Sequence, residues 1–179
     1  ESTRGLKPGS KVEFEGHMLE VELGPGLLSK NFDGLQNDLD KMEGVFLKRG
    51  LYTPALESDK KWAFTPLAKK GDKVIAGDWL GNVKENWLDH KIMVPFKFEG
   101  EYTVESVAAA GEYTINDVVA TLKDKEGEIH NVTMVQKWPV KLAVKAYKNK
   151  PRPYRLLETG VRVIDTMNPI LEGGTGFIP

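Results

Sequence analysis

The segment KKGDKVIAGDWLG, residues 69–81, sets the pattern that decides the fold. Its two short apolar pairs, Val74-Ile75 and Trp79-Leu80, each follow a Gly-Asp turn. The same alternation of apolar runs and turn residues continues from Trp62 to about Tyr147. Short, closely spaced strands joined by such turns are typical of a barrel or a sandwich. Residues 62–147 are therefore predicted to form a mainly β domain.

An internal repeat is visible within this region. The segment GDKVIAGD at residues 71–78 is echoed by GEYTIND at residues 111–117, an offset of 40 positions. Each copy places a glycine and an acidic residue before a short strand. Two readings stay open, a true duplication and a chance likeness between two β-turns.

The flanking segments predict a few further elements. Residues 12–14 and 19–23 alternate apolar and polar side chains, as half-buried strands do. Apolar residues between positions 27 and 42 recur at spacings near three and four, which predicts a short packing helix. Residues 159–167 read as another short helix with Thr159 as its N-cap, and residues 173–175 lead into a possible buried strand. The stripe of the first helix consists of Leu27, Leu28, Phe32, Leu35, Leu39 and Met42.

Composition and charge exclude several functions. The 179 residues include 25 basic and 26 acidic side chains, a net charge of −1, and no cysteine. Disulfides, thiolate zinc sites and cysteine nucleophiles are therefore excluded. A near-neutral chain is not a typical nucleic-acid binder, and the basic stretch at residues 141–155 is interpreted as a solvated linker. No run approaches the roughly 18–20 apolar residues that cross a bilayer, so direct membrane insertion is not expected.

The motifs of common reaction centres are missing. His17, His90 and His130 are too far apart in sequence to form a helical metal pair. The chain has no Gly-x-Ser-x-Gly elbow and no Gly-x-x-x-x-Gly-Lys-Ser/Thr phosphate loop. We therefore assign no catalytic, nucleotide-binding or metal-binding residue in this chain, and expect it to hold no cofactor.

Tryptophans are the candidate interface residues. Trp62, Trp79 and Trp87 lie in or beside predicted turns. Tryptophan often anchors protein interfaces, but core packing is an alternative role for each.

Three motifs in order resemble a known family. They are VELGPGLL at residues 21–28 with FDGLQ at 32–36, then QKWPV at 136–140 with Arg152-Pro153, then TGVRVIDT at 159–166 with GGTGFIP at 173–179. Together they closely resemble the catalytic A subunit of V-type and archaeal A-type rotary ATPases. Two departures stand out. Asn37-Asp38 replaces the family's Arg-Pro, and the basic linker at residues 141–150 is longer than expected.

The resemblance implies a domain plan. Residues 1–24 would be the last strands of an N-terminal β-barrel, and residues 25–61 a helical or irregular connector. Residues 62–147 would be the bulge, or non-homologous, domain, here with a barrel-sandwich-hybrid-like fold. Residues 148–179 would be a basic linker and the start of the α/β nucleotide-binding domain, with the phosphate loop immediately after Pro179.

The resemblance also implies a function. The whole protein would couple hydrolysis or synthesis of MgATP to proton or sodium transport. It would alternate with non-catalytic B subunits in a hexamer and contact peripheral stator subunits through the bulge. It would be cytoplasmic and peripheral to the membrane. This chain would then be a non-catalytic structural or interaction module.

A carrier domain is the alternative function. Residues 69–81 also look like one half of a lipoyl- or biotinyl-type barrel, and so do residues 92–95 together with 99–102. In such carriers the modified lysine precedes the matching proline by about eight residues. Counting back from Pro95 gives Trp87, with Lys84 and Lys91 on either side, so a carrier function is disfavoured.

Overall fold

The computed structural model describes residues 5–14, 16–42, 44, 52–147 and 149–176. The chain divides into two compact units, residues 1–146 and residues 147–179, each of which is described by itself. The predicted domain boundaries within the first unit stay predictions.

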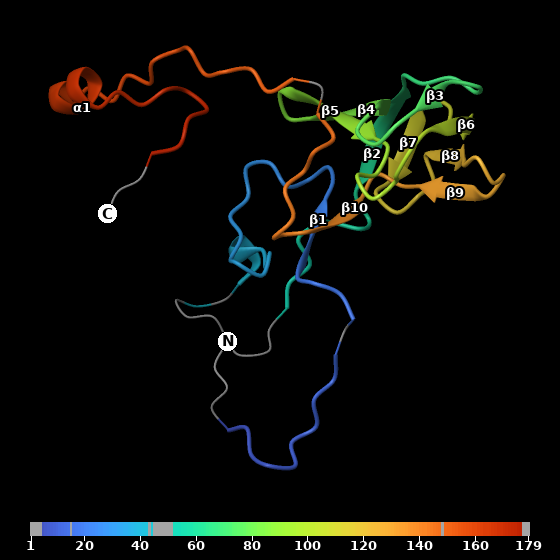
Figure 1. Ribbon diagram of the computed structural model, residues 1–179, viewed down its shortest axis with the longest axis horizontal. Coiled ribbons are helices and arrows are strands. Elements are labelled where there is room, and N and C mark those ends of the chain that lie inside the picture. Colours follow the sequence, from blue (N-terminus) through green and yellow to red (C-terminus); the bar gives the residue numbers. More distant parts are fainter. Residues whose placement is uncertain (1–4, 15, 43, 45–51, 148, 177–179) are drawn as a thin grey trace. The chain divides into compact units, whose positions relative to one another are not determined.

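Two four-stranded antiparallel sheets make up the body of the first unit in the described part of the chain (Figure 1). The first sheet has the order β5-β4-β2-β7 and the second the order β3-β6-β8-β9. The mainly β, barrel-sandwich expectation is confirmed. The strands are β2 (Lys61–Pro66), β3 (Lys73–Val74), β4 (Trp79–Glu85), β5 (Leu88–Met93), β6 (Tyr102–Val107), β7 (Gly111–Thr114), β8 (Ala120–Lys123) and β9 (Ile129–Val132).

The two sheets repeat one connectivity. Strands β2, β4 and β5 of the first sheet correspond to β6, β8 and β9 of the second. Strand β3 follows β2 in the chain but lies in the second sheet, and its counterpart β7 follows β6 but lies in the first. The same turn recurs in both halves. The amide of Ile75 donates to Asp78 Oδ2 at 2.9 Å, and the amide of Thr114 donates to Asp117 Oδ2 at 2.7 Å. This agreement favours a duplication, with the equivalent turn residues 39 rather than 40 positions apart.

Period-two alternation places the core between the sheets. In β2, Trp62 and Phe64 are buried, whereas Ala63 and Thr65 are exposed. Two apolar clusters result, and burial of this apolar surface is the main stabilising term. One contains Leu56, Trp62, Phe64, Val83, Ile92, Ile115, Val119 and Met134; the other contains Val74, Leu80, Val94, Val104, Ala120, Leu122 and Val132.

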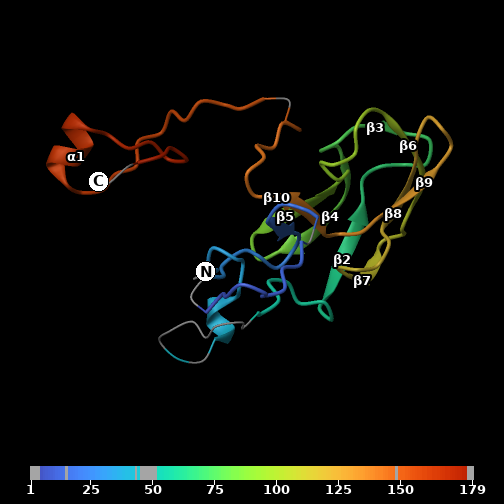
Figure 2. The same cartoon turned by 60° about the horizontal axis from the view of Figure 1, so that its bottom comes forward.

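A separate two-stranded ribbon joins the start of the chain to the end of the first unit. Strand β1 (Glu20–Leu23) pairs antiparallel with β10 (Gln136–Pro139), and the two strands are labelled next to each other in Figure 1. Figure 2 shows β10 close to the β4–β5 hairpin. The strand expected at residues 19–23 is thus confirmed. The strand expected at residues 12–14 is wrong, because this segment pairs with no strand among the described residues and Phe14 is 88% exposed.

The helix expected over residues 27–42 is also wrong. Only a short 3₁₀ turn, η1 (Leu39–Lys41), forms there. Asp33 explains the difference, because its Oδ1 accepts hydrogen bonds from the amides of Leu35 and Asn37 at 2.9 and 2.8 Å. Such local side-chain bonds compete with helical ones. Gln36 adopts a left-handed φ of 63°, and Phe32 forms an isolated antiparallel β-bridge with Asp38. The segment is therefore a polar loop.

The second unit contains one helix among its described residues, α1 (Arg162–Met167). The helix expected at residues 159–167 is therefore shorter than predicted, and its N-cap is Val161 rather than Thr159. Asp165 reaches back instead and accepts bonds from the Thr159 hydroxyl at 2.6 Å and the Gly160 amide at 3.1 Å. These bonds, with one from the Thr159 amide, hold the pKa of Asp165 below its ordinary value. The strand expected after residue 175 lies largely outside the described residues.

Across the residues that the structure describes, no helix combines the length and apolar character needed to span a membrane.

Candidate interaction surface

Trp62 is a core residue and not an interface residue. It lies on the inward face of β2, is 5% exposed and packs in the first apolar cluster. The ammonium of Lys60 lies 4.3 Å from the centroid of its ring. The expectation that Trp62 is available to a partner is therefore wrong, because the alternation of β2 turns its indole inward.

Trp79 and Trp87 are exposed on the β4–β5 hairpin. Trp87 is 76% exposed at the tip, where Glu85 pairs with Leu88 and closes a turn of two residues. Asn86 takes the left-handed φ of 51° in this turn, a conformation that asparagine tolerates better than most residues. Trp79, at the start of β4, is 57% exposed, and the ammonium of Lys91 lies 5.3 Å from its ring centroid.

Charged groups flank the apolar tip. The Lys84 ammonium pairs with Asp89 Oδ1 at 3.1 Å across the hairpin, and both side chains are exposed. Leu88 next to Trp87 is 45% exposed. The tip therefore presents an aromatic and an aliphatic side chain beside an ion pair, which is the mixture found at non-obligate interfaces.

A buried carboxylate lies at the base of this hairpin tip. Glu85 is 2% exposed. Its Oε1 accepts hydrogen bonds from the amide of Gly26 at 2.6 Å and from the amide of Leu28 at 3.3 Å. Its Oε2 accepts one from His90 Nδ1 at 2.6 Å. The sequence contains a signal for this site, because residues two positions apart in a strand share one face. Glu85 therefore lies on the same inward face as Val83.

The FDGLQ motif, residues 32–36, fastens the same connector to β1. The side chain of Gln36 accepts from the amide of Glu22 and donates to its carbonyl, both at 2.7 Å. Asn37 and Asp38, which follow this motif, are buried, and both side chains are bonded. Asn37 Oδ1 accepts from the amide of Thr53 at 2.9 Å, and Asp38 Oδ2 lies 3.4 Å from Lys30 Nζ.

An apolar cavity of about 250 Å³ lies between the connector and the sandwich. Glu85 and His90 form part of its wall. Its other lining residues are mostly apolar and include Leu27, Leu28, Ile92, Phe96 and Met134.

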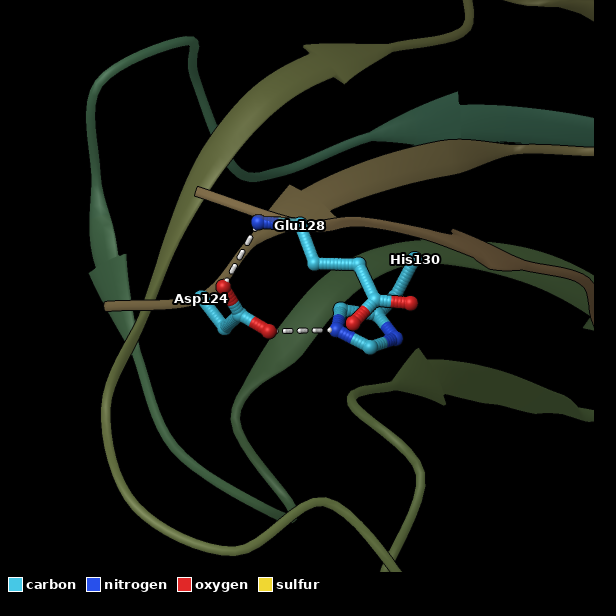
Figure 3. Close-up of side chains that lie close together, drawn as sticks. All are labelled: Asp124, Glu128 and His130. Carbon is cyan, nitrogen blue, oxygen red and sulfur yellow. Dashed lines mark hydrogen bonds and ion pairs between the residues drawn. The ribbon is translucent and has the colours of Figure 1, made fainter. Parts of the chain in front are cut away.

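Among the described residues, one group of side chains of the types that bind metal ions lies close together. It consists of Asp124, Glu128 and His130. Their ligand atoms lie within 4.8 Å of one another (Figure 3). Asp124 accepts from the Glu128 amide at 2.7 Å and from His130 Nε2 at 2.8 Å. The bond from His130 is the main reason that the pKa of Asp124 lies below its ordinary value. Imidazole and carboxylate groups could hold a divalent cation, but closure of the β8–β9 turn already explains these contacts.

The β4–β5 hairpin does not support the alternative function as a carrier domain. The structure places Asn86 and Trp87 at its tip, as the count back from Pro95 predicts. Lys84 is paired with Asp89, and Lys91 lies over Trp79. Neither lysine therefore stands at the tip, where a carrier would present its modified side chain.

The comparisons with known proteins assign the class. Residues 53–141 match the family model described as the ATP synthase alpha/beta subunit barrel-sandwich domain. The sandwich and its exposed hairpin therefore belong to this class of domain.

Relatives that align with the whole chain narrow the assignment. It is 50% identical to the A subunit of the A-type ATP synthase of Methanopyrus kandleri and 47% identical to the V-type ATP synthase alpha chain of Borrelia recurrentis. It is 46% identical to the V-type ATP synthase alpha chain 1 of Treponema pallidum. The chain belongs to this family of V-type and A-type ATP synthase alpha chains, or A subunits. All 179 residues are covered, and they span 30–32% of the length of these relatives.

Proposed function

We propose that this chain is part of the catalytic A subunit of a rotary V-type or A-type ATPase. In the whole protein, hydrolysis or synthesis of MgATP would be coupled to proton or sodium transport. The whole protein would alternate with non-catalytic B subunits in a hexamer at the cytoplasmic face of a membrane. The support is the identity of 45–50% across the entire chain to proteins named as ATP synthase alpha chains or A subunits.

We propose further that the chain contributes a partner-binding module and no catalytic residue. The observation that carries this proposal is the 76% exposure of Trp87 at the tip of a regular hairpin. An exposed indole offers a large apolar surface that a partner can bury at little conformational cost. The Lys84–Asp89 pair beside it would form a polar rim.

The proposed partner is a peripheral stator subunit of the same ATPase. A pocket that accepts an indole, with charged groups facing the Lys84–Asp89 pair, is the chemistry that would recognise the tip. Such an interface would be partly polar and reversible, as suits a contact in a regulated assembly.

Site-specific cross-linking in the purified, assembled ATPase tests the proposal. A photoreactive phenylalanine analogue replaces Trp87, and a control carries the same analogue at Ile129, which is 59% exposed on β9. We expect position 87 to form a cross-link to a stator protein, identified by mass spectrometry, and position 129 to form none. Cross-links from position 87 that stay within the catalytic chain would reject the tip as a docking surface.

A further inference from the structure

Glu85 joins two segments that are distant in sequence, the hairpin tip and the loop at residues 24–28, where the connector (residues 25–61) begins. One carboxylate oxygen bonds the connector, through the amides of Gly26 and Leu28. The other bonds the hairpin, through His90. We propose that Glu85 is a positioning residue that couples the tip to the connector, so that the two move as one body.

The register of the hairpin makes His90 the natural second partner. His90 is paired with Val83, whose side chain is buried, and Glu85 lies two residues further along the same inward face. Glu85 and His90 therefore lie diagonally across the two strands, where long side chains meet. The contact spans the hairpin just below Trp87, so we expect a tilt of the tip to disturb the carboxylate.

The connector side is equally constrained. Gly26 has a φ of 108°, a conformation that favours glycine, and its amide points at Glu85. Beyond this loop, Gln36 bonds both backbone groups of Glu22 in β1. A continuous series of bonded groups thus leads from the tip through Glu85 to the connector, and the connector is itself fastened to β1.

The consequence for a bound partner rests on the proposed function. A force applied at Trp87 would reach residues 24–28 through the Glu85 carboxylate, beside the apolar packing of Leu27 on the first core cluster. The coupling itself can be measured in this chain without any partner, so its failure is distinguishable from failure of the docking proposal.

Amide hydrogen exchange measures the first half of the coupling. In Glu85→Leu, which keeps the bulk but removes both acceptors, we expect the amides of Gly26 and Leu28 to exchange at least tenfold faster. In Glu85→Gln, which keeps one acceptor oxygen, the acceleration should be intermediate. Unchanged exchange of amides in the core of β4, such as that of Val83, would show that the fold is intact. A matched control, Glu105→Gln, removes an exposed partner of Lys70 and should change neither amide. Unchanged exchange of Gly26 and Leu28 in Glu85→Leu would overturn the proposal.

A double-mutant cycle measures the second half of the coupling. Its readout is the fluorine resonance of Trp87, which would not respond to the connector if Glu85 had a purely structural role. The chain is labelled with 5-fluorotryptophan, and the Trp87 resonance is assigned from Trp87→Phe. Gly26→Ala, which strains the connector, should shift the Trp87 fluorine resonance in the wild-type background. In the Glu85→Leu background the same change should shift it by less than a third as much. Equal shifts in the two backgrounds, or no shift in either, would show that the carboxylate does not couple the two segments.

Discussion

Phe64 on β2 lies directly against Gly81 on the neighbouring strand β4. A methyl group on Gly81 would stand 2.2 Å from the ring of Phe64 and 2.9 Å from the carbonyl oxygen of Thr65. Phe64 is 1% exposed and packs in the first apolar cluster, and the Thr65 oxygen belongs to the backbone. This contact explains why the strand that leads to the hairpin tip carries a glycine.

Gly81→Ala should therefore destabilise the sandwich. We expect a loss of about 1–3 kcal/mol or more, the usual cost of overpacking a filled core. The matched control is Gly34→Ala, since a methyl group there meets nothing within 4 Å. Urea unfolding measures both variants, and equal effects of the two would contradict the packing described for Phe64 and Gly81.

The buried and the exposed tryptophan should respond differently to truncation. Trp62→Ala removes a core side chain and should cost about 3–5 kcal/mol of unfolding free energy. Trp87→Ala removes an exposed one and should change it by less than about 0.5 kcal/mol. The measurement is equilibrium unfolding in urea, followed by far-ultraviolet circular dichroism. A large loss in Trp87→Ala would mean that the tip indole packs against the protein.

The β8–β9 turn should weaken in acid. The folded state lowers the pKa of Asp124, through the bond from His130 first and the backbone amides of Glu128 and Gly127 next. A carboxyl whose pKa is lower in the folded state stabilises the fold above its unfolded pKa, and this contribution is lost as the pH falls through the folded value. Carboxyl ¹³C NMR should therefore find Asp124 titrating below an ordinary aspartate. Asp124→Asn should remove this part of the acid sensitivity, and a normal titration midpoint would contradict it.

The chain itself should not bind nucleotide. Its sequence contains no loop with the glycines, lysine and hydroxyl that hold phosphates. Isothermal titration calorimetry of the chain with MgATP should show no binding at micromolar concentrations. A micromolar dissociation constant would show that nucleotide contacts exist in these 179 residues.

The sandwich was predictable because its signals are local. Trp62 and Phe64 alternate with Ala63 and Thr65, and Gly-Asp turns separate the short strands. The same alternation, read from Phe64, would have placed Trp62 in the core. Proximity to a turn was the weaker guide, because it says nothing about which face a side chain occupies.

The connector and the base of the hairpin were harder to predict. The apolar spacing from Leu27 to Met42 fits a helix, but the bonds that Asp33 makes to Leu35 and Asn37 favour a loop. The bonds from Gly26 and Leu28 to Glu85 join residues nearly sixty positions apart. Spacing along the chain cannot reveal such contacts. It also does not indicate that Asp124 and His130 are in contact, because these two residues meet only where β8 pairs with β9.

The coupling ratio of the assembled ATPase tests the central proposal most directly. Ions transported per ATP hydrolysed are measured for the wild type, for Trp87→Ser and for the control Ile129→Ser. We expect Trp87→Ser to keep ATP hydrolysis within about twofold, while its ion transport and its stator content fall at least threefold. Ile129→Ser should match the wild type. Transport, stator content and hydrolysis that all stay at wild-type levels in Trp87→Ser would contradict the account.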